Sequence, residues 1–167
     1  MANFTNETFS KHDDWMTPKS AWEDIAEYIP KDKAIWEAFY GDGKSGNILT
    51  ELGFKDVIHQ EIDFFENDLG EIVVSNPAFS IIPKVLERLV ELDKPFILIM
   101  PSSKINTQYF RKIFSANENK VQIIIPKKRI QFIKIQNGEE VKSKSACNFD
   151  CFYYCWKMNL PSDIVWL

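Results

Sequence analysis

The sequence contains no long apolar run and little cysteine. No stretch approaches the roughly 18–20 apolar residues that span a membrane, and the N-terminal segment MANFTNETFSKHDDW is polar and lacks a signal-peptide core. Three cysteines are an odd number, and outside a secretory context they do not indicate a disulfide framework. We therefore expect an intracellular, cytoplasmic protein with no membrane partner.

The cysteines Cys147, Cys151 and Cys155 are spaced by four residues, which raises the question of a metal site. The segment around them, ACNFDCFYYCWKM, is rich in aromatic residues and is typical of a strand. On a strand, residues four apart are separated by about 13 Å, at about 3.3 Å of rise per residue, which is too far for a shared tetrahedral metal. We expect structural core or surface thiols and no metal.

With 167 residues, the chain is long enough for one well-buried core and too short for two. We expect a flexible segment at residues 1–12 and a single domain at 13–167. Residues 1–100 carry 9 Lys or Arg against 19 Asp or Glu, whereas residues 101–167 carry 11 against 5. The basic C-terminal third indicates either a surface that binds an anion such as nucleic acid or a merely solvated basic face.

Predicted strands and helices alternate along the first two thirds of the chain. Helices are predicted at 17–29, 47–54, 77–92 and 105–114, and strands at 33–40, 56–62, 71–75 and 94–101. Three further strands are predicted at 121–126, 129–135 and 149–158, with an Asn-Gly turn between the last two. This order predicts an α/β fold with a mostly parallel, doubly wound sheet and antiparallel C-terminal strands.

Two helix termini carry recognisable signals. Thr17 is expected to be the N-cap of the first helix, with Pro18 in its first turn. Gly53 is expected to end the second helix. In doubly wound sheets, ligands bind beyond the carboxyl ends of the strands, so the segments that follow the strands are the ones to inspect.

The loop EAFYGDGKSG lies where one predicted strand turns into a helix. Gly41, Gly43 and Gly46 would let the backbone approach a ligand closely, and a helix N-terminus favours negative charge. The loop is not a Walker A motif, because four residues would have to separate the first glycine from Gly-Lys-Ser/Thr. The spacing permits the G-x-G-x-x-G pattern of nicotinamide-dependent enzymes, but no obvious hydride-chemistry residue accompanies it. A simple tight turn is the other interpretation.

The segment VVSNPAFS ends another predicted strand. The amide oxygen of Asn76 and the carbonyl oxygen of Pro77 could both accept hydrogen bonds from one exocyclic amine. Phe79 could stack on the ring that carries this amine, which is how an extruded base is usually held. An ordinary turn after a strand is the alternative for Asn-Pro taken alone.

Taken together, these segments resemble the S-adenosylmethionine-dependent N6-adenine DNA methyltransferases, particularly the compact phage and viral Dam-like type. The resemblance covers about residues 13–157, and its motifs occur in the family's order. They are DWMTP at 14–18, EAFYGDG at 37–43, DFF at 63–65, NPAF at 76–79 and KPFILIMP at 94–101. The resemblance implies a Rossmann-like class I methyltransferase fold and S-adenosylmethionine as the cofactor.

The resemblance also assigns a cofactor site. Gly41 and Gly43 would pass under the methionine part of the cofactor. Glu61 would bind its ribose hydroxyls, and Asp63 with Phe64 its adenine. The full set of implied cofactor-binding residues is Trp15, Thr17, Glu37, Phe39, Gly41, Gly43, Glu61, Asp63 and Phe64.

The resemblance further implies that Asn76, Pro77 and Phe79 receive the target adenine, and that the methyl group is transferred by direct displacement without a metal. Two positions depart from the family's pattern. Ala78 stands where a second proline is usual, and Glu37-Ala38 where Asp-Pro is commoner. Since a proline at 78 would restrict the backbone of Pro77, its absence leaves that carbonyl less firmly aimed.

The basic segment Lys127, Lys128 and Arg129 is the candidate nucleic-acid contact, with a charged turn as the alternative. No inserted target-recognition domain fits in the chain, so target choice would come from short loops, this segment or a partner subunit. PKKRIQF resembles a stretch in cap-adjacent RNA adenine methyltransferases, so RNA is the alternative target. A weakened methyltransferase-fold subunit that binds nucleic acid or another protein, in a homodimer or heterodimer, also stays open.

Overall fold

The structure is a computed structural model that describes residues 15–136, 139–140 and 149–167. The segment at 1–12, Asp14 of the DWMTP motif, Cys147 and the Asn-Gly pair at 137–138 lie outside the described residues. No helix among the described residues is long and apolar enough to cross a membrane.

The main sheet has seven strands and is mostly parallel. Its order is β10 (Ile164–Trp166), β6 (Val121–Ile125), β9 (Cys151–Trp156), β5 (Phe96–Pro101), β4 (Ile72–Ser75), β2 (Ile35–Trp36) and β3 (Val57–Ile58). β9 is antiparallel to both of its neighbours, and every other pairing in this sheet is parallel. The α/β class is therefore confirmed, with the antiparallel strand inside the sheet and β10, which the sequence did not predict, at its edge.

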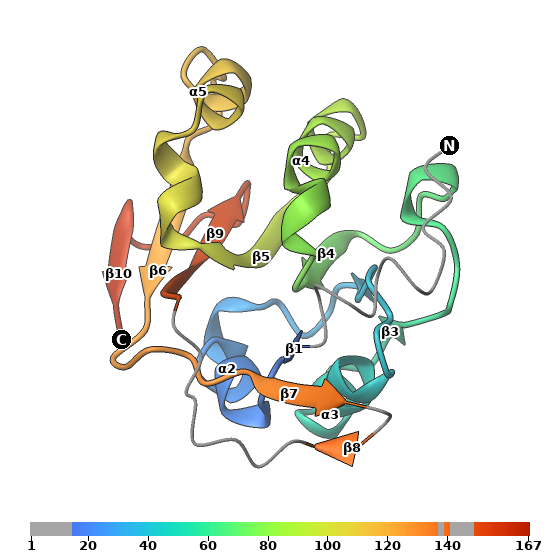
Figure 1. The fold of residues 1–167 in the computed structure, drawn as a ribbon. Coiled ribbons are helices and arrows are strands. Elements are labelled where there is room, and N and C mark those ends of the chain that lie inside the picture. The colour runs from blue at the N-terminus through green and yellow to red at the C-terminus, as the bar shows by residue number, and fades with distance from the viewer. Residues whose placement is uncertain (1–14, 137–138, 141–148) are drawn as a thin grey trace.

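Helices cover both faces of this sheet (Figure 1). On one face lie α2 (Lys19–Glu23) and α3 (Lys44–Glu51), and on the other α4 (Ile82–Glu91) and α5 (Gln108–Phe114). Strand residues alternate between the two cores: Ile97 packs with the α2 and α3 side, whereas Leu98 packs with the α4 and α5 side. All six residues of β5 are buried, as expected for a strand covered on both faces.

The described residues also form short 3-10 turns. Within the helices predicted at 17–29 and 77–92 lie η1 (Ala26–Tyr28) and η3 (Phe79–Ile81), η2 (Phe64–Glu66) lies between β3 and β4, and η4 (Ser102–Asn106) follows β5. The helix predicted at 17–29 is interrupted at Ile25, whose φ of −111° and ψ of 1° are not helical. Gly53, with φ of +95°, follows the end of α3 as predicted.

A second, three-stranded antiparallel sheet joins β1 (Trp15–Met16), β7 (Ile133–Gln136) and β8 (Glu139–Glu140). The predicted pairing of 129–135 with 149–158 is therefore wrong, because β7 pairs with β8 and β1 while β9 enters the main sheet. The burial pattern gives the reason: β9 buries side chains on both faces, including Tyr153 and Tyr154, and only the centre of the main sheet offers two covered faces.

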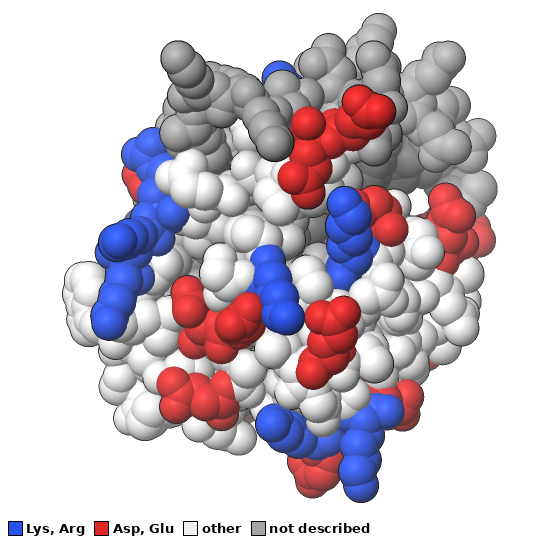
Figure 2. Space-filling view, turned by 90° about the horizontal axis from the view of Figure 1, so that it is seen from below, with Lys and Arg blue, Asp and Glu red and all other residues white. Residues whose placement is uncertain are grey.

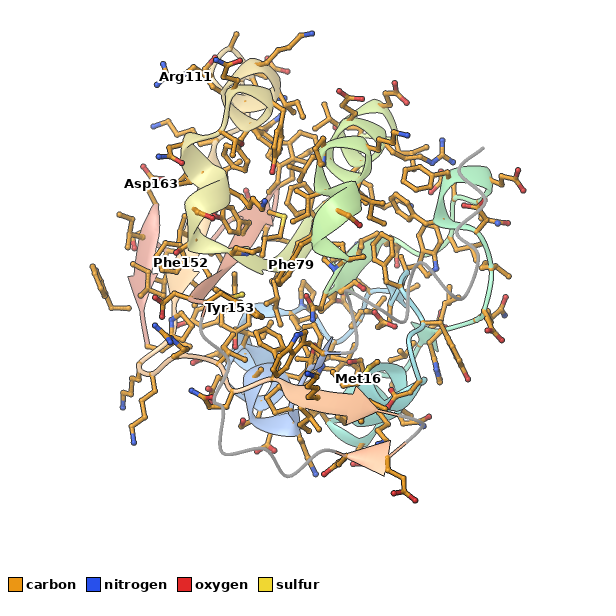
Figure 3. All side chains as sticks on the ribbon, in the orientation of Figure 1. Met16, Phe79, Arg111, Phe152, Tyr153 and Asp163 are labelled. Carbon is orange, nitrogen blue, oxygen red and sulfur yellow. The ribbon has the colours of Figure 1, made fainter. Side chains whose placement is uncertain are left out.

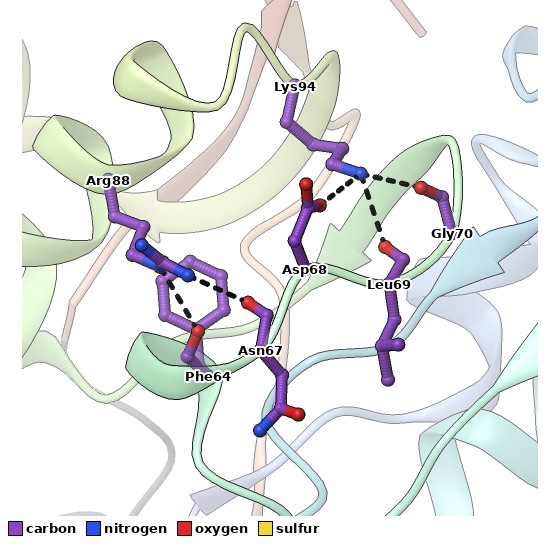
Figure 4. A network of polar contacts seen from close by, with 7 residues as sticks. All are labelled: Phe64, Asn67, Asp68, Leu69, Gly70, Arg88 and Lys94. Atoms are coloured by element: carbon purple, nitrogen blue, oxygen red, sulfur yellow. Dashed lines mark hydrogen bonds and ion pairs between the residues drawn. The ribbon is translucent and has the colours of Figure 1, made fainter.

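The chain between β3 and β4 is fixed by two cations (Figure 4). Arg88 on α4 donates to two backbone carbonyls, and the ammonium of Lys94, a largely buried residue, binds two more and a carboxylate. All five contacts measure 2.5–3.3 Å. Their oxygens belong to Phe64, Asn67, Asp68, Leu69 and Gly70. This network holds the segment after η2 against α4.

Candidate functional site

The chain reverses its direction across the sheet between β2 and β4. These two strands are neighbours, yet β2 leads through α3 to β3 on one side, and β4 leads through α4 to β5 on the other. Helices α3 and α4 lie on opposite faces (Figure 1). Ligands of doubly wound folds bind outside the carboxyl ends of the strands at such a switch point. The predicted glycine loop and the NPAF segment both lie there.

Buried polar atoms without partners gather at the same edge. Among the described residues, five buried side-chain nitrogens or oxygens lack a hydrogen-bond partner. Four of them belong to a residue that ends or follows β2, β3 or β4, namely Trp36, Glu37, His59 and Asn76. Since buried polar groups are normally paired, this concentration marks the edge as a place where a ligand would supply the missing partners.

Asn76 presents a free acceptor. Its Nδ2 donates to Thr17 Oγ1 at 3.0 Å, which fixes the amide, and its Oδ1 is buried without a partner among the described residues. The prediction that Thr17 caps the first helix is wrong: Pro18 occupies the N-cap position, and no side chain caps that helix. The Thr17 hydroxyl instead accepts the hydrogen bond from Asn76.

Pro77 and Ala78, which follow Asn76, have backbone groups without hydrogen-bond partners among the described residues. No hydrogen bond between described residues reaches the carbonyl oxygen of Pro77 or uses the N–H of Ala78. Ala78 has φ of −57° and ψ of 132°, and its carbonyl accepts from Ile81 N at 3.1 Å. The φ of Ala78 lies within the range that a proline requires. The backbone of Ala78 is therefore compatible with a proline, although alanine does not impose this φ.

Phe79 lies between the end of β4 and the small sheet (Figure 3). Its ring and that of Phe149 are nearly perpendicular, with a centroid distance of 5.2 Å. Phe149 also contacts Trp15 at 6.1 Å and Phe132 at 5.5 Å. Trp15, expected in the cofactor site, thus belongs to an aromatic cluster beside the NPAF segment. Sequence analysis missed Phe132 and Phe149, because no local pattern brings them to Phe79.

Glu37 is the buried carboxyl group of the site. It is 1% exposed, Ser75 donates a hydrogen bond to its Oε1, and its Oε2 has no partner among the described residues. Burial raises the pKa of Glu37 to about 8 against the opposing effect of the bonds from Ser75 and from the backbone of Phe39, so the carboxyl is protonated at neutral pH. Ser75, which also accepts from Phe39 N at 3.3 Å, was not singled out in the sequence.

The glycine loop turns as predicted. Gly41 and Gly43 have positive φ, +58° and +80°, and α3 begins directly after them. A Cβ at Gly41 would stand 3.5 Å from the Met16 sulfur, an ordinary contact, so its φ rather than crowding requires glycine. A Cβ at Gly43 would stand 2.8 Å from the Tyr40 hydroxyl, so this glycine also makes room for a ring.

Gly46 has a packing role. A Cβ there would stand 2.2 Å from the His59 ring, which is stacked with Tyr40 at 6.1 Å. Gly46 therefore brings α3 against the residue that follows β3. This contact accounts for the third glycine of the G-x-G-x-x-G spacing without a dinucleotide.

The residues after β3 divide into an exposed acid and a packed aromatic. Glu61 is exposed, and Asp63 is the N-cap of η2, its Oδ1 accepting from Phe65 N at 2.8 Å. Phe64 is 3% exposed and lies 5.0 Å from the ring of Phe39. The structure thus brings Phe39 and Phe64 together beside the end of β2, and it gives Asp63 a structural bond that the sequence did not reveal.

The predicted basic segment is at the surface. Lys127 and Lys128 are exposed, whereas Arg129 forms a two-pronged ion pair with Asp150 at 2.8 and 3.2 Å. The hydrogen bond from Arg129 lowers the pKa of Asp150. Figure 2 shows acids and bases interspersed on the face seen from below, with basic side chains gathered along its left edge, the side of β6 and the chain that follows it.

A comparison of the sequence with protein-family models gave no match, and no curated protein matched it either. The geometry of this edge is therefore the basis on which a function can be inferred.

Proposed function

We propose that the protein transfers a methyl group from S-adenosylmethionine to the exocyclic N6 of adenine in DNA. The observation that carries the proposal is the Oδ1 of Asn76, a buried, oriented and unpartnered acceptor at the switch point of the sheet. An adenine amine brings two donor hydrogens, and the carbonyl of the adjoining Pro77 is the second available acceptor.

The chain's residues fit the cofactor on two observations. The buried Oε2 of Glu37 lacks a partner, and the loop after β2 turns at Gly41 with a backbone that only glycine adopts readily. Gly41, Gly43 and Thr17 would hold the methionine part, with Glu61 and Phe64 toward the ribose and adenine. When bound, S-adenosylmethionine supplies an electrophilic methyl group on a sulfonium.

The protein's contribution to the chemistry is placement. The amine of adenine is a poor nucleophile because its lone pair is delocalised into the ring, and acceptors on both of its protons localise that pair. Asn76 and Pro77 would provide these acceptors. With Asn76 Nδ2 donating to Thr17, the Asn76 oxygen is the atom left for the base. Holding reactants in line accounts for up to about 7–11 kcal/mol of a barrier.

The aromatic cluster suggests how the base is held. The ring of Phe149 already packs against that of Phe79 in a T-shaped pair, which helps to orient Phe79 before a base arrives. An adenine would stack on the part of the Phe79 ring that Phe149 leaves uncovered.

A labelling experiment tests the proposal. The protein is incubated with methyl-labelled S-adenosylmethionine and, separately, duplex DNA, single-stranded DNA and RNA, and the methylated nucleosides are identified by mass spectrometry. We expect label on adenine of DNA. Label on adenine of RNA alone would favour the RNA alternative. Label on cytosine, or none despite cofactor binding, would overturn the proposal and favour a weakened subunit in the second case.

A further inference from the structure

The turn η4 follows β5, the neighbour of β4, the strand that leads into the NPAF segment. In the β4–β5 register, Ser75 ends β4 opposite Leu98, whereas β5 continues to Pro101. Three further residues at about 3.3 Å each carry β5 roughly 10 Å past the end of β4. η4 begins there, so it projects from the same carboxyl edge that holds Asn76.

A chain of contacts joins η4 to the basic segment and to Phe79. Ser102 N, the first donor of η4, bonds to the carbonyl of Asp150 at 2.8 Å, and the carboxylate of Asp150 binds Arg129. The preceding residue, Phe149, contacts Phe79. The turn η4, the segment 127–129 and the NPAF segment therefore belong to one continuous edge.

The side chains on this edge have the chemistry of a polyanion contact. Residues 101–138 carry eight Lys or Arg and one acid, Glu118. Among the described residues, Lys104, Lys127 and Lys128 take part in no ion pair. Ile105, next to Lys104, is 45% exposed, one of three large hydrophobic side chains exposed in the described structure.

We propose that η4 is a second nucleic-acid contact, in which Lys104 binds a backbone phosphate and Ile105 enters the duplex as an apolar wedge beside the extruded adenine. Lys127 and Lys128 would bind phosphates on the other side of the strand. This inference rests on the proposed function for the identity of the partner.

The physical reason is the cost of extrusion. Taking a base out of a duplex costs a few kcal/mol in lost stacking and pairing, and apolar side chains such as isoleucine partly unstack base steps in other DNA-binding proteins. An exposed isoleucine flanked by a cation on a projecting turn provides both the wedge and its electrostatic attachment. A single strand has no duplex to open and needs only the cation.

Equilibrium binding separates the two roles. A fluorescently labelled duplex of mixed sequence and its single strand are titrated with the complete protein over a range of salt concentrations. Lys104→Ala should reduce the slope of log affinity against log salt by about 0.9 for the duplex, the value for one phosphate contact. Ile105→Ser should weaken duplex binding at least about fivefold with an unchanged slope, and single-strand binding less than about twofold.

The chain offers matched controls. Arg111 is an exposed cation further along α5, at the top of Figure 3 and away from Phe79, and Arg111→Ala should leave the slope unchanged. Ile164 on β10 is 51% exposed, and Ile164→Ser should leave both affinities unchanged. Circular dichroism of each variant confirms folding.

The inference is overturned if Lys104→Ala and Ile105→Ser bind the duplex as the wild type does, if Ile105→Ser weakens both nucleic acids equally, or if the wild type binds neither. Binding requires no methyl transfer, so the two proposals fail separately. Altered binding in these variants without any methylated nucleoside would leave η4 a nucleic-acid contact and remove the proposed activity. Methylated adenine together with wild-type binding by both variants would support the proposed activity and exclude η4 as a nucleic-acid contact.

Discussion

Two regions of this protein treat buried polar groups in opposite ways. In the network around Arg88 and Lys94, two cations bind five oxygens and tie the chain after η2 to α4. At the switch point, the oxygens Asn76 Oδ1 and Glu37 Oε2 are buried without partners among the described residues. An unpaired buried polar group costs about 1–3 kcal/mol. The first region therefore contributes to the stability of the fold. The second lowers stability, and a ligand that paired these oxygens would restore it.

Replacing the unpaired acceptor should have the largest effect. Asn76→Ala should lower the rate of methyl transfer at least about 1000-fold, because it removes one of two acceptors on the adenine amine. It should leave cofactor affinity within a few fold. The free energy of unfolding should change by no more than about 1 kcal/mol, because the lost hydrogen bond to Thr17 is offset by removal of a buried oxygen that had no partner among the described residues. Initial rates and calorimetric titration measure these quantities. Normal turnover by this variant would show that the role assigned to Asn76 is wrong.

The satisfied network should respond in the opposite way. Lys94→Met should lower the free energy of unfolding by about 3 kcal/mol, because it leaves a carboxylate and two carbonyls without their common donor. Its control, Lys33→Met, removes an exposed ion pair with Glu71 and should cost less than about 1 kcal/mol. Urea denaturation compares them. Equal losses would contradict the contrast between the two regions.

The buried carboxyl should make stability depend on pH. Between its ordinary pKa of 4.5 and the raised value of about 8, Glu37 binds a proton in the folded protein that the unfolded chain has released. The free energy of unfolding should therefore fall as the pH rises through this window. Glu37→Gln cannot ionise and should remove that fall, with a gain of up to about 4 kcal/mol at pH 7.5, from about 1.36 kcal/mol for each of roughly three pH units above the ordinary pKa.

Denaturation at several pH values measures this slope. Glu51→Gln, which changes an exposed carboxylate at the end of α3, should keep the wild-type slope. A wild-type slope in Glu37→Gln would mean that Glu37 is ionised in the folded protein.

The smallest effect is expected at Ala78. The φ of this residue suits a proline, and its N–H makes no hydrogen bond to another described residue. Ala78→Pro should leave the rate of transfer unchanged or raise it by about threefold, by restraining the Pro77 carbonyl. Steady-state kinetics on the same DNA substrate test this. A large fall in the rate would show that the site is built around alanine.

The sequence predicted which segments form the candidate site, but not which of their side chains contact one another. The alternation of strands and helices indicated a mostly parallel sheet, and that alone put the glycine loop and the NPAF segment at neighbouring carboxyl ends. It did not reveal that Thr17 bonds Asn76 or that Phe149 contacts Phe79, because those pairs lie 59 and 70 residues apart in the chain. It also misplaced β9, since a strand's neighbours depend on which sheet can cover both of its faces.

In the proposed reaction, the unpaired oxygen of Asn76 receives the exocyclic amine of adenine. The most direct measurement is the position of the methyl group on nucleosides recovered from duplex DNA after incubation with the protein and S-adenosylmethionine, resolved by mass spectrometry against N1- and N6-methyl standards. We predict N6-methyladenine with the wild type and none with Asn76→Ala. Methyl groups on N1 of adenine or on cytosine, or equal N6-methyladenine from both proteins, would show that Asn76 does not receive this amine.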